Sequence, residues 1–252
     1  MTKITTILLD CDNTLVLSEE LAFEACAELS NEILEKQGIS DRYTGPSLLK
    51  SFVGQNFRGM MTSLCKKYNF TLTPEEFDSY VDRELGKVIE TLEKKAQPCP
   101  GVMDELEKLH GLQKMHAEKK YLMAVVSSSA LSRVQASIKK VGMDKYFDPG
   151  HVFSAATSLD RPTSKPDPAI YLHACKVLGK STSECVAVED SRSGATAAKN
   201  AKIPLIGYVG PYEGAEQDEM YNMLKNDCGA IYVMRHWNEF ETALKTVEDA
   251  VA

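Results

Sequence analysis

The hydrophobic pattern of this chain alternates between short apolar runs and longer stretches with helical spacing. Ile4–Leu9, Tyr121–Val126 and Cys185–Val188 are mostly apolar runs of four to six residues, which is typical of strands buried on both faces of a parallel sheet. Later runs near Leu205–Val209 and Ala230–Val233 predict further strands. Because helical stretches separate these runs, the order predicts an α/β fold built on a doubly wound parallel sheet.

Between the first two runs, the chain has a helical pattern from about Ser18 to Gln97. Leu21, Ala25 and Leu29 recur at the spacing of one helix face, and Thr73-Pro74-Glu75-Glu76 is typical of a helix start. The two prolines of Gln97-Pro98-Cys99-Pro100-Gly101 prevent a continuous helix and mark the return to the sheet. The predicted domains are an α/β core (residues 1–16 and 97–252) and an inserted all-helical domain (residues 17–96).

Polar side chains follow the predicted strands. Asp10 and Asp12 come directly after the first run, Ser127 ends the second, and Glu189-Asp190 ends the third. Lys165 lies between these runs, beside two prolines and before the helical pattern Pro168–Leu178. The carboxyl ends of parallel strands converge on one crevice, where buried carboxylates need a metal, a proton or a hydrogen-bond partner. We therefore expect these residues to form one site.

These motifs, in this order, resemble the haloacid dehalogenase (HAD) superfamily, specifically its phosphatase branch with a helical cap inserted after the first motif. β-Phosphoglucomutase and phosphoglycolate phosphatase are members of that branch. The resemblance covers essentially the whole chain and rests on Asp10-x-Asp12-x-Thr14, Ser127, Lys165 and Glu189-Asp190. It implies a Rossmann-like core and a helical cap domain. One departure is Asn13, which stands where the family most often has Gly.

The resemblance implies a role for each of these residues. Asp10 is expected to be the nucleophile that forms an aspartyl-phosphate, and Asp12 the general acid and then the general base. Ser127 and Lys165 are expected to bind phosphoryl oxygens. The expected cofactor is Mg²⁺, a cation that prefers oxygen ligands. Its expected ligands are the side chains of Asp10 and Asp190 and the backbone carbonyl of Asp12, with Glu189 either a ligand or a residue behind the ligands.

Substrate contacts are harder to place from the sequence. Ser128 and Ser129, which follow Ser127, are expected to line the pocket. In the predicted cap, the stretch Phe52–Arg58 combines a glycine with polar side chains. The candidate substrate-binding residues of this stretch are Gly54, Gln55, Asn56 and Arg58. Arg58 is open to two interpretations, a contact to a second anionic group of the substrate or a solvated helix residue.

Composition narrows the class of protein. With 252 residues, the chain is long enough for one α/β core plus an insertion, and its 43% hydrophobic and 26% charged residues are ordinary for a globular protein. A formal net charge of −7 argues against a nucleic-acid or anionic-membrane partner. No apolar stretch is long enough for a membrane span or a signal peptide. Seven cysteines without a regular framework favour reduced thiols. We therefore expect a cytoplasmic protein, a monomer or weak homodimer, whose partner is a small phosphate ester.

The predicted function is that of a Mg²⁺-dependent phosphatase acting on a small phosphorylated metabolite, a sugar or polyol monophosphate. The dehalogenases of the resembled superfamily lack the second Asp, so Asp12 favours phosphate esters over haloacids. A sugar phosphomutase of the β-phosphoglucomutase type remains an alternative, because it uses the same motifs. A non-catalytic binding protein on the same fold is a further alternative.

Overall fold

A computed structural model describes residues 3–52, 55–115 and 121–252. The chain divides into two compact units. We call Met1–Leu17 with Gln97–Ala252 the core unit and Ser18–Ala96 the helical unit, and each is described by itself. Among the described residues, no helix has both the length and the apolar character needed to cross a membrane.

The core unit is built on a six-stranded sheet in which every neighbouring pair is parallel. In spatial order its strands are β5 (Val152–Ser154), β4 (Leu122–Ser127), β1 (Thr6–Leu9), β6 (Cys185–Glu189), β7 (Leu205–Tyr208) and β8 (Tyr232–Met234). Every residue of β1 and β6 is buried, as expected for strands covered on both faces. The predicted fold class, an α/β protein with a parallel sheet, is confirmed.

Three central strands end side by side. Leu9 of β1 is in register with Val125 of β4 and Val188 of β6. The residues that follow each strand therefore emerge at the same edge of the sheet. This register places the chain after Leu9, the end of β4 and the Glu189-Asp190 pair next to one another.

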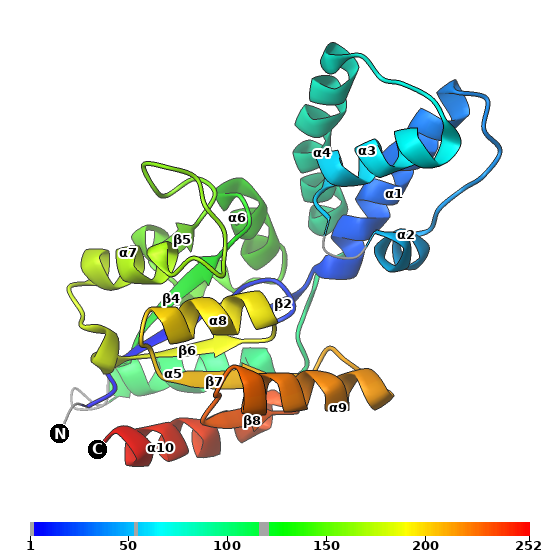
Figure 1. Cartoon of the computed structure of the whole chain (residues 1–252). Helices are drawn as coiled ribbons and strands as arrows, with labels where there is room; N and C mark the ends of the chain where they lie inside the picture. The colour runs from blue at the N-terminus through cyan, green and yellow to red at the C-terminus, as the bar shows by residue number, and fades with distance from the viewer. Residues whose placement is uncertain (1–2, 53–54, 116–120) are drawn as a thin grey trace. The chain divides into compact units, whose positions relative to one another are not determined.

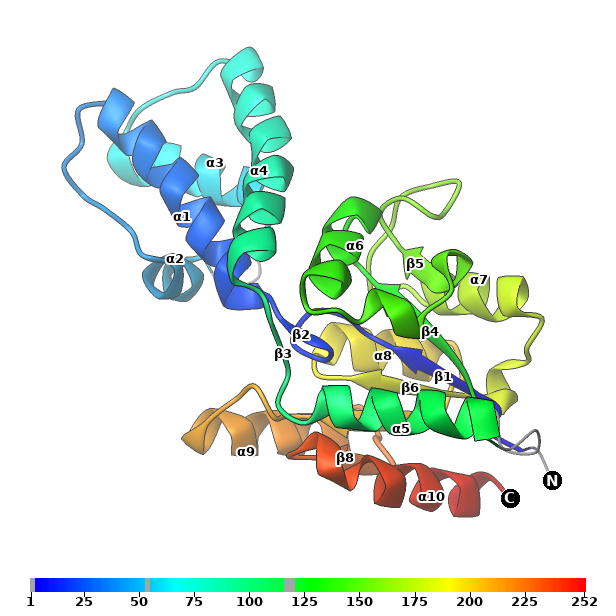
Figure 2. The ribbon, with the colours of Figure 1, turned by 180° about the vertical axis from the view of Figure 1, so that it is seen from behind.

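Helices cover both faces of this sheet (Figures 1 and 2). The helices of the core unit are α5 (Val102–Met115), α6 (Leu131–Lys140), α7 (Ala169–Leu178), α8 (Arg192–Asn200), α9 (Gly214–Asn222) and α10 (Phe240–Val251). Helix α8 lies in front of the sheet in Figure 1, and α5 lies in front of it in Figure 2. Small residues on α7 and α8, such as Ala174 and Ala198, pack into one core with Leu8 and Ala187 of the sheet, which lets the helices approach closely.

Short elements complete the core unit. A two-stranded antiparallel ribbon joins β2 (Val16–Leu17) to β3 (Gln97–Pro98), so the two segments that flank the helical unit are paired. Single helical turns cover Asp144–Tyr146, Pro149–His151, Thr182–Glu184, Met223–Asp227 and Trp237–Glu239.

The helical unit consists of α1 (Glu19–Lys36), α2 (Gly45–Ser51), α3 (Phe57–Tyr68) and α4 (Pro74–Lys95). Helix α1 packs against α2 and α4, and α3 packs against α4. The predicted start of α4 is confirmed, since Thr73 and Glu76 form a capping box there. Leu29, one of the residues that the helical spacing placed on one face of α1, is buried in the core of this unit together with Ile33 and Leu34.

Candidate active site

The first motif begins where β1 ends. Asp10 follows the last strand residue, and its N–H donates to the carbonyl of Val188 at 3.1 Å. The chain then turns through Asn13, whose φ of 54° lies in the left-handed region that Asn tolerates better than most residues. This conformation explains why Asn can replace Gly here. The intervening Cys11 is buried, and burial raises the pKa of its thiol well above the ordinary value, so it does not supply a thiolate.

Lys165 is the centre of the buried charges. Its Nζ lies 2.6 Å from Asp10 Oδ1 and 2.6 Å from Glu189 Oε1, and it donates to the carbonyl oxygen of Val126 at 2.7 Å. An ammonium group has three hydrogens to donate. All three are engaged by these acceptors, and the side chain is 3% exposed. The two carboxylates raise the pKa of Lys165 against the opposing effect of burial, so Lys165 is a fixed positive charge.

Glu189 ends β6 and is fully buried. Its Oε1 accepts from Lys165 and from the hydroxyl of Tyr171, on α7. Burial, opposed by Lys165, raises the pKa of Glu189 to about 7. Gly194 on α8 faces this carboxylate, and a Cβ at that position would overlap it. Within the described parts of the chain, Glu189 Oε2 has no hydrogen-bond partner, although a buried carboxylate oxygen normally has one.

Asp190, the next residue, is held by two hydroxyl groups. Tyr212, in the loop after β7, donates to Asp190 Oδ2 at 2.7 Å, and Thr14 donates to Oδ1 at 3.5 Å. The carbonyl of Thr14 in turn accepts from the indole N–H of Trp237 at 3.1 Å. These contacts fix the direction of the carboxylate.

Asp10, Glu189 and Asp190 together form a possible metal site. Their oxygen atoms can be chosen so that all lie within 4.8 Å of one another, and all three residues are buried. Three carboxylates and the one ammonium of Lys165 leave two negative charges, which a divalent cation would neutralise. The unpartnered Oε2 of Glu189 and the all-oxygen donor set both fit a hard cation such as Mg²⁺.

Asp12 lies on the more accessible side of this site. The hydroxyl of Ser129 donates to Asp12 Oδ2 at 2.7 Å, and Arg133, on α6, donates to Oδ1 at 2.8 Å. The side chain of Asp12 is 25% exposed, against 9% for Asp10. The two Asp residues of the first motif therefore differ in environment, one fixed by the buried Lys165 and the other paired with a guanidinium near solvent.

Ser127 ends β4 and Ser128 follows it, and each accepts a hydrogen bond from a backbone N–H of the site. Ser127 Oγ accepts from the N–H of Ser129 at 3.0 Å, which leaves the hydroxyl hydrogen of Ser127 available to donate. Ser128 Oγ accepts from the N–H of Lys165 at 3.1 Å, so Ser128 holds the backbone of the lysine loop. The structure thus brings Asp10, Asp12 and the residues at positions 127, 128, 165, 189 and 190 together at one edge of the sheet.

Comparison with known proteins identifies the family. The family model described as "Hydrolase: haloacid dehalogenase-like hydrolase" matches residues 4–202, more than three quarters of the chain. The chain belongs to the haloacid dehalogenase-like hydrolases. The family that the sequence motifs predicted is confirmed, and so is the prediction of an enzyme.

Named relatives of this hydrolase include two phosphatases. The 6-phosphogluconate phosphatase of Escherichia coli is 27% identical over 201 residues, 80% of this chain and 80% of that protein. The phosphorylated carbohydrates phosphatase of Thermotoga maritima is 28% identical over 200 residues, 79% of this chain and 82% of that protein. The hydrolase spans only 20% of another relative, the Arabidopsis thaliana Protein SUPPRESSOR OF QUENCHING 1, chloroplastic, with 26% identity over 92% of this chain.

Solved structures agree on the fold of this hydrolase. A HAD hydrolase of family IA, variant 3, from Entamoeba histolytica superposes with a TM-score of 0.74. The two are 22% identical, and the alignment covers 97% of this chain and 99% of the other.

The predicted substrate-binding residues of the inserted segment belong to the helical unit, which is described apart from the core unit. Gly54 lies outside the described residues. Gln55 Oε1 accepts from Ser63 at 2.8 Å, and Asn56 is the N-cap of α3. Arg58 forms an exposed ion pair with Asp78. Each of the three described residues thus has a contact within its own unit.

Three residues of the site were not predicted from the sequence. Tyr171 reads as an apolar position of a helix, and Arg133 as one cation of an amphipathic helix. Tyr212 carried a usable signal, because it follows the predicted strand near Leu205–Val209 and so belongs to the edge of the sheet at which Asp10 emerges.

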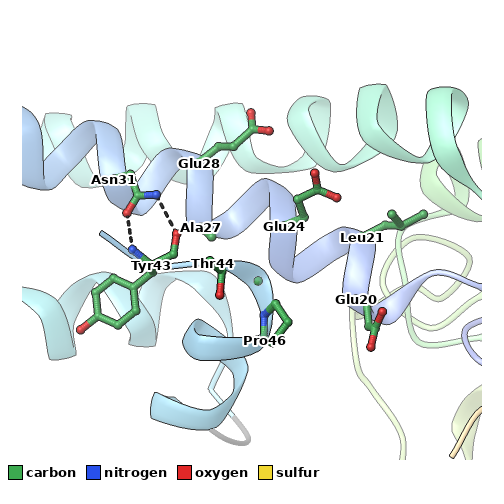
Figure 3. Close-up of a pocket in the computed structure, with 10 residues that line it drawn as sticks. Glu20, Leu21, Glu24, Ala27, Glu28, Asn31, Tyr43, Thr44 and Pro46 are labelled. Carbon is green, nitrogen blue, oxygen red and sulfur yellow. Dashed lines mark hydrogen bonds between the residues drawn. The ribbon is translucent and has the colours of Figure 1, made fainter. Parts of the chain in front are cut away.

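A separate hollow of about 400 Å³ lies within the helical unit, between α1 and the segment that leads into α2 (Figure 3). Asn31 ties this segment to α1 through two hydrogen bonds to the backbone of Tyr43, of 2.8 and 2.7 Å. The acidic residues Glu20, Glu24 and Glu28, all on α1, also line the hollow. Lys95 pairs with Glu24, and Lys87 with Glu28, so much of the acidic charge is already compensated.

Proposed function

We propose that this hydrolase is a Mg²⁺-dependent phosphatase that cleaves a small sugar or polyol monophosphate through an aspartyl-phosphate. The observation that carries the proposal is the cluster of Asp10, Glu189 and Asp190, the first two of which are paired with Lys165. The names of the Escherichia coli and Thermotoga maritima relatives support a phosphorylated carbohydrate as substrate.

Asp10 is the proposed nucleophile. Its Oδ1 is held by Lys165, which fixes the carboxylate and leaves Oδ2 to attack phosphorus. The new Asp10–phosphorus bond forms as the bond from phosphorus to the ester oxygen breaks. Water then attacks the aspartyl-phosphate, which releases inorganic phosphate and restores the carboxylate.

Asp12 is the proposed acid and base. It protonates the departing ester oxygen in the first step and removes a proton from the attacking water in the second. Ser129 and Arg133 hold the two carboxylate oxygens of Asp12, so its position is set before substrate binds. The Asp12 proton passes to the product alcohol and is replaced from the water, so protons balance over one cycle.

Mg²⁺ is the proposed cofactor, held by the side chains of Asp10 and Asp190 and by the backbone carbonyl of Asp12, with Glu189 beside them. When bound, it supplies positive charge against the phosphoryl oxygens. Ser127 donates its free hydroxyl hydrogen to the same oxygens. Since the three donors of Lys165 are all engaged, this lysine acts on the phosphoryl group through its charge and by fixing Asp10.

The proposal is tested by measuring phosphate release from a panel of sugar, polyol and short-acid phosphates, with and without Mg²⁺. We expect metal-dependent release from a few related compounds and at least a 1000-fold loss in Asp10→Asn, because the variant lacks the nucleophile. Accumulation of an isomeric sugar phosphate in place of free phosphate would identify a mutase. Normal turnover in Asp10→Asn would refute the assigned nucleophile.

A further inference from the structure

Lys165 is held between two carboxylates at the same distance. Its Nζ lies 2.6 Å from Asp10 Oδ1 and 2.6 Å from Glu189 Oε1, and at equal distances the two carboxylates attract the ammonium equally. In the proposed reaction Lys165 must stay on Asp10, because that contact fixes the nucleophile. A second donor to Glu189 reduces the pull of Glu189 on the ammonium and so favours the contact with Asp10.

Tyr171 supplies this second donor. Its hydroxyl donates to Glu189 Oε1, the same oxygen that accepts from Lys165, and a carboxylate oxygen has two lone pairs for two donors. The ring of Tyr171 also lies beside the ammonium, with its centroid 5.3 Å from Lys165 Nζ, which is within the range of a cation–π contact. Tyr171 is fully buried, so water does not compete for either contact.

The fold holds Tyr171 in this position. Tyr171 lies in the first turn of α7, six residues after Lys165. The start of the helix is fixed, because the N–H of Ala169 donates to Asp167 Oδ1 at 2.9 Å. The ring belongs to the same buried core as Leu8 of β1. Tyr171 therefore cannot leave Glu189 without disturbing the packing between α7 and the sheet.

We propose that Tyr171 is a positioning residue that keeps Lys165 on the nucleophile Asp10, acting through Glu189 and through its own ring. This inference rests on the proposed phosphatase function and adds a residue to its machinery. A tyrosine that only filled the core would need its ring but not its hydroxyl. Removing the hydroxyl alone therefore separates the two roles.

The test is Tyr171→Phe, which removes the hydroxyl and keeps the ring. We would measure kcat and KM with Mg²⁺ for the best substrate of the phosphate ester panel. Urea unfolding of each variant gives the folded fraction, so that kcat is expressed per folded molecule. The matched control is Tyr146→Phe. Tyr146 is also a buried tyrosine of the core unit whose hydroxyl donates to a glutamate, at 2.6 Å from Glu107 Oε2, but the Glu107 side chain is 63% exposed and is not part of the site.

We expect Tyr171→Phe to lower kcat by about 10- to 100-fold with little change in KM, the usual effect of removing a residue that orients the groups of a metal site. Tyr146→Phe should leave both constants unchanged. An unchanged kcat in Tyr171→Phe, or a rise in KM alone, would overturn the inference and leave Tyr171 a core residue or a substrate contact. If the unchanged enzyme releases phosphate from no ester of the panel, the proposed function itself fails, and this inference fails with it.

Discussion

Replacing Lys165 with Met tests whether the buried charges are balanced as the structure indicates. Methionine has nearly the length and volume of lysine but carries no charge and no donor. The change removes two contacts of 2.6 Å to carboxylates and one of 2.7 Å to a backbone carbonyl. Asp10 and Glu189 would then share a buried space with no cation.

The size of the effect follows from this burial. Removing one partner of a buried ion pair costs about 3–5 kcal/mol, because an uncompensated charge is left behind. Glu189 can reduce the loss by binding a proton. Its folded-state pKa is already raised to about 7 from an ordinary 4.5, and Lys165, which lowers that pKa, would be gone. A carboxyl with a raised folded-state pKa binds more protons when folded, so stability falls as pH rises between the two pKa values.

We therefore expect Lys165→Met to lose about 3–5 kcal/mol at pH 8 and clearly less at pH 5. The assay is urea unfolding with a chelator present, followed by fluorescence. The single tryptophan, Trp237, is buried in the core unit and reports the unfolding of that unit. Lys145→Met is the control, since Lys145 is 60% exposed and 3.7 Å from its partner. A loss below about 1 kcal/mol at pH 8, or an equal loss at both pH values, would refute the charge balance described here.

Two further predictions concern one residue in each unit. Gly194→Ala places a Cβ where the Glu189 carboxylate lies; we expect about 1–3 kcal/mol of destabilisation and a loss of phosphate release. The control is Gly86→Ala on α4, where the new Cβ meets no atom within 4 Å and should be stabilising. In the helical unit, Arg83 lowers the pKa of Glu32 to about 2. This ion pair should contribute up to about 1 kcal/mol to the free energy of unfolding above pH 4.5, and the contribution should disappear as the pH falls toward 2. The unfolding temperatures of Arg83→Ala and the unchanged protein should therefore differ at pH 7 and converge at pH 2. A difference that stays constant with pH would argue against the pair.

Much of the fold could be predicted because the central strands carry apolar runs of four to six residues. The runs that form β1, β4 and β6 are buried on both faces of the sheet. A strand buried on both faces has apolar residues at successive positions, so an apolar run in the sequence predicts it. β5 has only three residues at the edge of the sheet, too few to form a recognisable run. The helix α2 begins with Gly45-Pro46, a pair that reads as a turn although Pro is favoured in the first turn of a helix.

Apart from Lys165, which the family resemblance indicated, the candidate site was predictable only where residues follow strands. Asp10, Ser127 and Asp190 are placed by the register of the sheet, which the pattern of strands already implies. Tyr171 and Arg133 are on helices instead, and the direction of a helical side chain depends on how the helix is rotated against the sheet. That rotation is set by packing at many positions at once, so no local spacing reveals it.

The two carboxylate–cation contacts of the first motif behave differently because their burial differs. Water hardly reaches the Lys165–Asp10 contact, so exchanging either partner for solvent costs several kcal/mol and the charge stays fixed. The Arg133–Asp12 contact is partly exposed, with side chains 19% and 25% exposed, so water and salt screen it more than they screen the Lys165–Asp10 contact. A fixed charge suits a nucleophile that must keep its position, and a partly solvated pair suits the proposed acid, which must exchange its proton in every cycle. It follows that added salt should weaken a function that depends on Arg133 more than one that depends on Lys165.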